Sequence, residues 1–354
     1  MSRKLVAFFP AHPSQIWVLK QAAEKTSSFA DVLWFLRDKD ISTTLADDLG
    51  IEYTLISRAG TGFIGNGTEF LKNMFRAAEL NRKKDIDLWV TKYGAFHIAS
   101  RFQGRKSLGF IDDDIDLIPI IAWTSYPFVD EIIAPEVTRM GIWKRKTNRF
   151  SGNFELSYLH PDIFTPDANI NEFLGIDSGS RFAVVRLSSL SAHHDLGRKG
   201  LNTVLLREVI KISSRESISI FITSENPLDS EFEQFRMPIP PSKIHSTLAN
   251  AEFVLGDSQT MIQEAAVLGT PAFRINDFVG RISIMNELER MELSQGFRPG
   301  SEKQLITSLK ELLAMENRET VFLERRRRLL EIWEDPTPLI VSRIRHLLDL
   351  EVAV

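Results

Sequence analysis

The stretch FVLGDSQTMIQEAAVLGTPAF, residues 253–273, decides the fold because it predicts a strand, a polar turn, a short helix and a second strand in succession. Residues 253–255 are apolar, and Gly256 permits a sharp exit from that strand. Capping oxygens for a helix that starts near Thr260 come from Asp257, Ser258 and Thr260. The Gly-Thr-Pro sequence at 269–271 then ends the helix.

A helix that begins directly after a strand offers a binding site for an anion. Its first backbone N–H groups are unpaired, its dipole is positive at that end, and parallel sheets gather ligands at the edge where the strands end. Glu264 lies one turn further along, on a face that could reach the hydroxyls of a ribose. The alternative is that residues 257–260 are ordinary helix caps of a strand-helix unit.

Composition limits the class of protein. The chain has 354 residues, which is long for one hydrophobic core, so two domains are expected. A net charge of −4 with both signs mixed argues against a nucleic-acid surface. The basic cluster at 325–328 lies in a helical pattern and is better explained as a solvated helix face. Because the chain has no cysteine, disulfides, thiolate nucleophiles, zinc-thiolate sites and iron-sulfur clusters are excluded.

The sequence indicates a cytoplasmic protein. The apolar segment before Pro10 is too short for a signal peptide or a membrane span, and no later run approaches about 18 apolar residues.

Apolar runs alternate with helical stretches along the chain. In the first half the runs span residues 5–9, 31–36, 53–56, 88–90, 107–111, 118–123 and 131–134. After a polar, proline-containing stretch, strand patterns return at 181–187 and 218–223, and helical patterns follow at 201–213, 244–249, 302–313, 320–333 and 338–350. This alternation is typical of a parallel sheet covered by helices on both faces.

We therefore expect an α/β fold made of two Rossmann-like, doubly wound parallel-sheet domains that face each other across a cleft. The N-terminal domain would comprise residues 1–150, and residues 151–180 would connect the domains. The C-terminal domain would comprise residues 181–335. A C-terminal helix at 336–354 could pack back on the N-terminal domain.

The loop at 188–200 follows the first strand of the second domain and contains His193, His194 and Asp195. A histidine at this edge could donate to a phosphate or act as an acid or base, because its ordinary pKa lies near neutrality. A structural loop and a metal site are the alternatives. The metal site is the weaker of these, since adjacent residues point apart and rarely chelate one ion.

The first domain offers two candidates at the same edge. His12, in the first strand-to-helix turn, could orient or deprotonate a substrate, or it could cap the following helix. The glycine-rich stretch 58–68 could be a loop that closes over an acceptor. The first turn has no glycine, which argues against a nicotinamide-binding domain, and no Walker-type sequence is present. Residues 92–97 are a less specific candidate.

Four carboxylates lie within residues 112–116, directly after the run at 107–111. Such a cluster could hold a divalent metal, or one of its carboxylates could be a general base whose pKa is raised by its acidic neighbours. The third interpretation is a helix N-cap surrounded by solvated acids.

Three segments together resemble a microbial family described only as a domain of unknown function. They are ELSYLHP at 155–161, RLSSLSAHHDLG at 186–197, and the stretch at 253–273. That family is similar to glycosyltransferases of the two-Rossmann (GT-B) type and to non-hydrolysing UDP-N-acetylglucosamine 2-epimerases. The resemblance extends over nearly the whole chain, from Phe9 to Pro271.

The resemblance implies that the N-terminal domain forms the acceptor and catalytic side and that the C-terminal domain forms the nucleotide side. It also implies roles for particular residues. Ser258, Gln259 and Thr260 would hold the diphosphate of a sugar nucleotide, and Glu264 its ribose. The loop with His193 and His194 resembles a histidine-bearing loop of the epimerases. This chain departs from them in having Gln259-Thr260 where they carry a glycine pair, and their carboxylate catalysts match only the cluster at 112–114.

The sequence therefore predicts a GT-B-like enzyme that acts on a nucleotide-diphosphate sugar, as a metal-independent glycosyltransferase in polysaccharide or glycoconjugate biosynthesis. The helix near Thr260 would stabilise the departing diphosphate, so neither a metal nor a cofactor is expected. Catalytic roles fall on His12, Asp113 and His193, and substrate binding falls on His194, Ser258, Gln259, Thr260 and Glu264.

The expected partners are the sugar-nucleotide donor and a glycan or lipid-linked acceptor, with peripheral membrane association but no nucleic acid. One alternative is a nucleotide-sugar 2-epimerase. Another is a sugar-nucleotide or glycan binding protein that has lost catalysis. The sequence leaves enzymatic activity and oligomeric state open.

Overall fold

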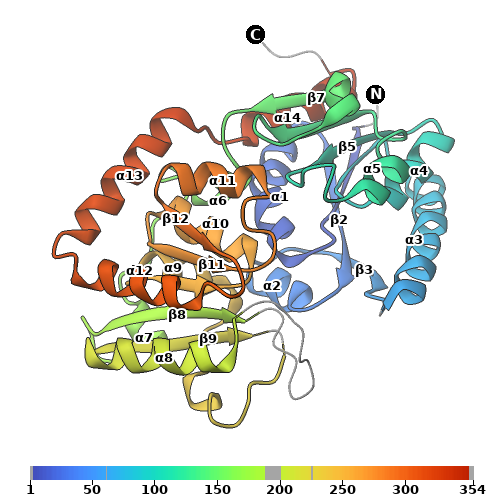
Figure 1. Cartoon of the computed structure of the whole chain (residues 1–354). Coiled ribbons are helices and arrows are strands. Elements are labelled where there is room, and N and C mark those ends of the chain that lie inside the picture. The colour runs from blue at the N-terminus through green and yellow to red at the C-terminus, as the bar shows by residue number, and fades with distance from the viewer. Residues whose placement is uncertain (1–2, 61, 188–200, 225, 351–354) are drawn as a thin grey trace. The chain divides into compact units, whose positions relative to one another are not determined.

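The computed structural model describes residues 3–60, 62–187, 201–224 and 226–350. Its internal contacts divide the chain into unit 1, which comprises Met1–His160 and Trp333–Val354, and unit 2, Pro161–Ile332. Each unit is an α/β structure, and every strand pairing among the described residues is parallel (Figure 1).

Unit 1 is built on a seven-stranded sheet with the order β3-β2-β1-β4-β5-β6-β7. Its strands are β1 (Leu5–Phe9), β2 (Asp31–Asp38), β3 (Thr54–Arg58), β4 (Leu88–Thr91), β5 (Lys106–Phe110), β6 (Glu131–Pro135) and β7 (Thr147–Phe150). The central strands are mostly apolar because helices cover both faces of the sheet. In β1 and β4, for example, Val6 pairs with Leu88, and both side chains are fully buried.

The helices of unit 1 are α1 (Pro13–Thr26), α2 (Ser42–Asp48), α3 (Gly62–Lys84), α4 (Gly94–Phe102), α5 (Pro119–Ser125), α6 (Leu156–Leu159) and α14 (Thr337–Leu347), with a 3-10 helix at Gly141–Lys146. An aromatic cluster fills the space between the sheet and these helices. Trp89 of β4 lies 4.5 Å from Phe96 of α4 and 5.3 Å from Phe35 of β2, measured between ring centroids. The indole N–H of Trp89 donates to Asn81, so the buried ring has no unpaired donor.

Two expectations for unit 1 were wrong. The apolar run at 118–123 forms α5 rather than a strand, because Pro119 starts a helix well and burial follows a helical face, with Ala122 and Ser125 buried and Trp123 exposed. The glycine-rich stretch 58–68 is not a long loop, since α3 begins at Gly62. Packing of α3 against α4 outweighs the local cost of its glycines.

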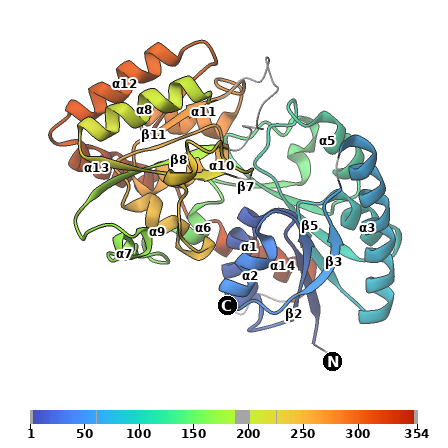
Figure 2. The same cartoon turned by 90° about the horizontal axis from the view of Figure 1, so that it is seen from below.

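The C-terminal helix α14 belongs to unit 1, where it packs against α1 and β5 (Figure 2). Arg343 forms an ion pair with Glu131 of β6, with its Nε 2.6 Å from one carboxylate oxygen. Arg345 lies over the ring of Phe29 at 3.8 Å. These contacts attach the end of the chain to the first sheet.

Unit 2 is built on a five-stranded sheet with the order β12-β11-β10-β8-β9. Its strands are β8 (Arg181–Leu187), β9 (Ile218–Ser224), β10 (Val254–Gly256), β11 (Ala272–Ile275) and β12 (Ser294–Phe297). Its helices are α7 (Ile170–Leu174), α8 (Thr203–Arg215), α9 (Ile244–Ala249), α10 (Gln259–Leu268), α11 (Ser283–Arg290), α12 (Glu302–Ala314) and α13 (Arg318–Ile332), with 3-10 turns at Glu233–Phe235 and Pro241–Lys243. Helices α8 and α12 pack together, while α10 packs against α9, α11 and α13 (Figure 2).

The basic cluster at 325–328 is only partly a solvated face. Arg327 and Arg328 are exposed and pair with acids of α13 itself. Arg325 instead reaches Glu292, and Arg326 donates to the carbonyl of Val267 at the end of α10. Half of the cluster therefore anchors α13 to the rest of unit 2. Within the described residues, none of the helices has the length and apolar character needed to cross a membrane.

Candidate functional site

The first candidate site lies in unit 2 between β8 and β10, where the strand order reverses. From β8 the chain continues to β9 on one side, and from β10 to β11 on the other. Ligands of open parallel sheets bind at this position. Gly256 ends β10 there, and a Cβ atom on it would lie 2.8 Å from the carbonyl oxygen of Arg186. Only glycine allows β10 to approach β8 this closely.

Helix α10 starts at Gln259, one residue before the predicted start, and Ser258 is its N-cap. The hydroxyl of Ser258 makes no capping hydrogen bond, so the expectation that its oxygen caps the helix was wrong. The turn is held from β11 instead, since the side-chain amide of Asn276 donates to the carbonyl oxygen of Asp257 at 3.0 Å. The helix ends at Gly269, whose φ of 84° is left-handed, as the sequence predicts.

Two arginines lie in register on either side of Gly256. Arg186 is its partner on β8 and Arg274 its partner on β11. Arg274 is fully buried and pairs with Glu289 of α11 at 2.8 Å, and its Nε and Nη1 have no hydrogen-bond partner among the described residues. Burial lowers the pKa of Arg274 below its ordinary value, which still leaves it charged. The anion preference at this position therefore comes first from the positive end of α10, because Glu289 already balances the charge of Arg274.

Glu264 is buried in the second turn of α10 and contacts His245 of α9, with 3.2 Å between His245 Nε2 and Glu264 Oε1. His245 is itself buried and packs edge-on against Phe164. Sequence reasoning missed this partner because the two residues are 19 positions apart. A histidine within the apolar pattern at 244–249 was the available signal. The predicted residues His193 and His194 lie outside the described residues.

The second candidate site lies in unit 1 between β1 and β4, where the order of that sheet also reverses. The hydroxyl of Thr91 joins the two strand ends, because it donates to the carbonyl of Phe9 at 2.8 Å and accepts from the backbone of Tyr93 at 3.0 Å. His12 follows β1, Lys92 follows β4, and the carboxylates at 112–116 follow β5. The predicted groups of unit 1 therefore come from neighbouring strand ends.

His12 caps α1. Its Nδ1 accepts the backbone N–H of Ser14 at 3.3 Å and lies 2.9 Å from the Ser14 hydroxyl. The capping alternative for His12 is thus present in the structure. Because Nδ1 accepts this bond, the neutral ring carries its proton on Nε2, which makes that nitrogen a donor.

The carboxylates at 112–116 are divided between two cations. Lys92 pairs with Asp112 and with Asp113, the latter at 2.6 Å. Asp114 is fully buried and accepts the backbone N–H of Arg139 at 2.7 Å, while the Arg139 side chain pairs with Asp116. In the part of the chain that the structure describes, no group of three or more metal-ligating side chains is present.

The raised pKa that the sequence predicts for one carboxylate of this cluster is not found at Asp113, whose pKa is lowered. The charge of Lys92 lowers the pKa of Asp113 against the opposing effect of burial, so the carboxylate is ionised at neutral pH. Tyr126 lies close to the same group. Its hydroxyl is buried without a hydrogen-bond partner among the described residues, and burial raises its pKa.

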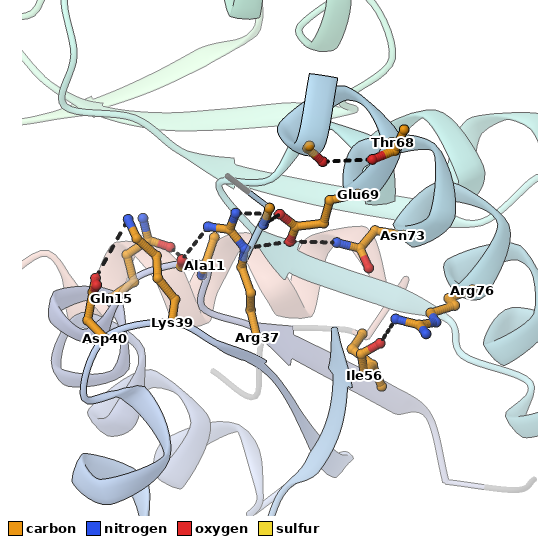
Figure 3. A network of polar contacts seen from close by, with 12 residues as sticks. Ala11, Gln15, Arg37, Lys39, Asp40, Ile56, Thr68, Glu69, Asn73 and Arg76 are labelled. Carbon is orange, nitrogen blue, oxygen red and sulfur yellow. Dashed lines mark hydrogen bonds and ion pairs between the residues drawn. The ribbon is translucent and has the colours of Figure 1, made fainter. Parts of the chain in front are cut away.

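An ion pair that the sequence did not reveal connects β2 with α3 (Figure 3). Glu69 accepts from Nε and Nη2 of Arg37 at 2.5 and 2.6 Å, from the backbone N–H of Gly60 at 2.7 Å, and from Asn73 at 3.3 Å. Arg37 also reaches the carbonyl of Ala11, next to His12. A charged residue on the buried face of a long helix was the signal for this pair.

The comparisons with known proteins agree with this architecture. A family model described as "Protein of unknown function (DUF354)" matches residues 121–348, more than half of the chain. The chain belongs to this DUF354 family. No curated protein matches the DUF354 chain in sequence.

Solved structures share the fold along the whole DUF354 chain. A co-structure of Staphylococcus aureus MnaA with UDP matches with a TM-score of 0.70 at 11% identity, covering 99% of this chain and 98% of that one. A putative UDP-N-acetylglucosamine 2-epimerase from Listeria monocytogenes matches with a TM-score of 0.70 at 14% identity, covering 99% and 96%. The glycotransferase of kitacinnamycin matches with a TM-score of 0.61 at 11% identity, covering 98% and 100%. The DUF354 chain thus has two parallel-sheet α/β domains of the GT-B type.

Proposed function

We propose that this protein is an enzyme that acts on a nucleotide-diphosphate sugar, as a glycosyltransferase of polysaccharide or glycoconjugate biosynthesis in the cytoplasm. One observation carries the proposal. Helix α10 begins where the strand order of unit 2 reverses, and Arg186 and Arg274 lie in register on either side of Gly256. Support comes from the fold, which is that of a structure solved with UDP.

In the proposed reaction the first backbone N–H groups of α10, with Ser258, Gln259 and Thr260, hold the diphosphate. Negative charge develops on the diphosphate as the bond to the sugar breaks, and the positive end of a helix stabilises that charge without a metal. Glu264 accepts the ribose hydroxyls. A carboxylate accepts several hydrogen bonds, so His245 can orient Glu264 while the ribose binds.

Unit 1 supplies the base that activates the acceptor hydroxyl. We assign this role to Asp113, because Lys92 keeps it ionised. His12 is a donor through Nε2 and orients the acceptor, since its Nδ1 is engaged by Ser14. For His193 and His194 we propose contacts with the donor phosphates or the sugar.

The second candidate function is 2-epimerisation of a nucleotide sugar, and the names of the solved neighbours favour it. Structures titled as UDP-N-acetylglucosamine 2-epimerases match with TM-scores of 0.70, 0.67 and 0.65. Incubation with a sugar nucleotide alone separates the two activities, because only an epimerase converts the sugar without an acceptor. Absence of turnover with donor and acceptors would leave the third candidate, a sugar-nucleotide binding protein.

The experiment that tests the donor site is thermal unfolding in the presence of uridine, guanosine, cytidine and thymidine diphosphates. A ligand that binds only the folded state stabilises it by about 2.7 kcal/mol at a hundredfold excess over its Kd. We expect at least one diphosphate to raise the Tm, and its nucleoside to raise it less. If no diphosphate raises the Tm, both enzymatic proposals fail.

A further inference from the structure

A cavity of about 630 Å³ opens in unit 1 at the carboxyl end of the edge strand β3, beside the first turns of α3. It lies within the volume range of small-molecule sites. Its described lining is Leu55, Ile56, Ser57, Arg58, Ala59, Gly60, Gly65, Thr68, Glu69, Lys72 and Arg76. None of these residues has a role in the donor site described above.

The lining of this cavity is cationic. It contains Lys72, Arg76 and Arg58, of which Arg58 pairs with Asp38 at 3.2 Å, whereas its one carboxylate, Glu69, is already neutralised by Arg37. Arg76 crosses from α3 to the carbonyl of Ile56 on β3 (Figure 3). Lys72 is exposed and forms no ion pair with the residues that the structure describes. Lys72 and Arg76 form no ion pair with a carboxylate of the described residues, so these two side chains present positive charge to a ligand.

A buried polar group in the wall also lacks a partner. Ser57 belongs to the lining of the cavity and is 6% exposed, and its buried Oγ has no hydrogen-bond partner among the described residues. A buried hydroxyl without a hydrogen bond is costly, and a ligand oxygen in the cavity would remove that cost. This observation is independent of the cations on the rim.

One group in the lining of the cavity, the Glu69 carboxylate, is held in place by several hydrogen bonds. The Glu69 carboxylate accepts from Arg37, Gly60 and Asn73, and it is therefore positioned before any ligand arrives. Through Arg37 the same network reaches Ala11, whose backbone N–H is held by Gln15 at the start of α1. Glu69 is thus connected, through Arg37 and Ala11, to the turn that carries His12.

We propose that this cavity binds the phosphate of a phosphate-bearing acceptor, with Lys72 and Arg76 contacting the phosphate and Ser57 donating a hydrogen bond to it. The inference rests on the proposed transferase function, since it names the chemical class of the acceptor. The phosphate can belong to a soluble sugar phosphate or to the headgroup of a lipid, because both present the same dianionic group.

The test uses the full chain with two kinds of probe. Glucose 1-phosphate and neutral glucose are titrated by calorimetry in the presence of a saturating concentration of the nucleoside diphosphate that raises the Tm most, so that the donor site is occupied. Phosphatidylcholine vesicles with and without phosphatidic acid are tested by co-sedimentation. We expect binding of glucose 1-phosphate but not glucose, or of the vesicles that contain phosphatidic acid only. The arm that responds identifies the source of the phosphate, and no response in either arm overturns the proposal.

Variants locate the binding to this cavity. K72Q/R76Q removes two exposed charges and should weaken binding of the responding probe by about tenfold or more. The control R82Q/K83Q removes the same charge further along α3, outside the cavity, and should bind as the wild type does. Equal affinity in K72Q/R76Q, or an equal loss in the control, overturns the proposal.

The outcome for the cavity can be separated from the outcome for the donor site. If a nucleoside diphosphate binds but neither phosphate probe does, only the acceptor inference fails. If a phosphate probe binds the cavity and none of the four nucleoside diphosphates is bound, the proposed function fails and the anion site remains. S57A adds a further measurement, because it should weaken phosphate binding without changing the charge.

Discussion

Glu69 of α3 holds Arg37 of β2 through both carboxylate oxygens, at 2.5 and 2.6 Å, and the two side chains are 6% and 11% exposed. The pair joins an edge region of the sheet to a helix whose first turns are rich in glycine. Because Arg37 also reaches the carbonyl of Ala11, the pair fixes the position of α3 relative to the first strand-to-helix turn.

Loss of the arginine should destabilise the fold strongly. Arg37→Met leaves Glu69 as a buried carboxylate without its cation, and breaking a buried pair in this way costs about 3–5 kcal/mol. Urea unfolding measures the change. The control Arg105→Met breaks a pair with Asp85, whose side chain is 83% exposed, and should cost less than about 1 kcal/mol. Similar losses in the two variants would contradict a structural role for the Arg37–Glu69 pair.

The same pair predicts a pH dependence of stability. Burial opposes ionisation of Glu69, but hydrogen bonds from Arg37 and Gly60 outweigh it, and the pKa of Glu69 is lowered. The pKa of a glutamate in the unfolded chain is about 4.3. A carboxyl group whose pKa is lower in the folded state stabilises the protein at pH values above this unfolded pKa, and the stabilisation is lost as the pH falls through the folded pKa. The stability advantage of the wild type over Glu69→Gln should therefore shrink as the pH falls below about 4.

Urea unfolding of both proteins across the acid range provides this measurement. Glu52→Gln, which removes an exposed carboxylate, is the comparison variant. A difference between the wild type and Glu69→Gln that stays constant with pH would contradict the assignment.

The fold class could be predicted because its evidence is local. Buried strands such as β1 are uniformly apolar, and the polar turn at Gly256 marks the start of α10 in a few residues. Helix α5 was mistaken because a short apolar run has no period that separates a strand from a helix. The start of α3 was mistaken because glycine predicts a loop locally, whereas packing along a 23-residue helix outweighs that tendency.

The pairs that build the candidate sites could not be predicted in the same way. Arg37 and Glu69 are 32 residues apart, and Lys92 and Asp112 are 20 apart, so only the order of the strands brings them together. The sequence pointed to Asp113 but not to its cation. It therefore could not predict that the pKa of Asp113 is lowered, because the charge and hydrogen bond of Lys92 outweigh the effect of burial.

If Asp113 is the base, Lys92 should determine the pH at which kcat/KM falls on the acidic side of its pH profile. Lys92→Met removes the charge that lowers the pKa of Asp113, so the pKa of Asp113 should rise and less of the ionised base should be present at mildly acidic pH. The acid limb of the kcat/KM profile should then move to higher pH. Lys92→Arg should restore it, and Lys106→Met, on the exposed start of β5, should leave it in place. An unmoved limb in Lys92→Met would exclude Asp113 as the titrating base.

Two glycine substitutions should have opposite effects on stability. In Gly256→Ala the new Cβ would meet the carbonyl of Arg186 at 2.8 Å, and such overpacking costs about 1–3 kcal/mol. Gly67→Ala, within α3, adds a Cβ that has no atom within 4 Å, and should stabilise the protein by about 0.5–1 kcal/mol. Thermal and urea unfolding measure both. A neutral Gly256→Ala would mean that β10 does not need its close approach to β8.

Glu264→Ala should weaken binding of the preferred nucleoside diphosphate by about 1–3 kcal/mol, the usual cost of losing a charged hydrogen-bond partner. Calorimetry measures the affinity. Because the substitution also leaves His245 buried without its carboxylate, Glu264→Gln serves as the second variant, with a smaller loss since it keeps one acceptor oxygen. The exposed Glu311→Ala, on α12, controls for the change in net charge. The Tm of each Glu264 variant first shows that it is folded. If Glu264 contacts the ribose, both variants bind the nucleoside diphosphate more weakly than Glu311→Ala does. Equal affinities would assign Glu264 to the core alone.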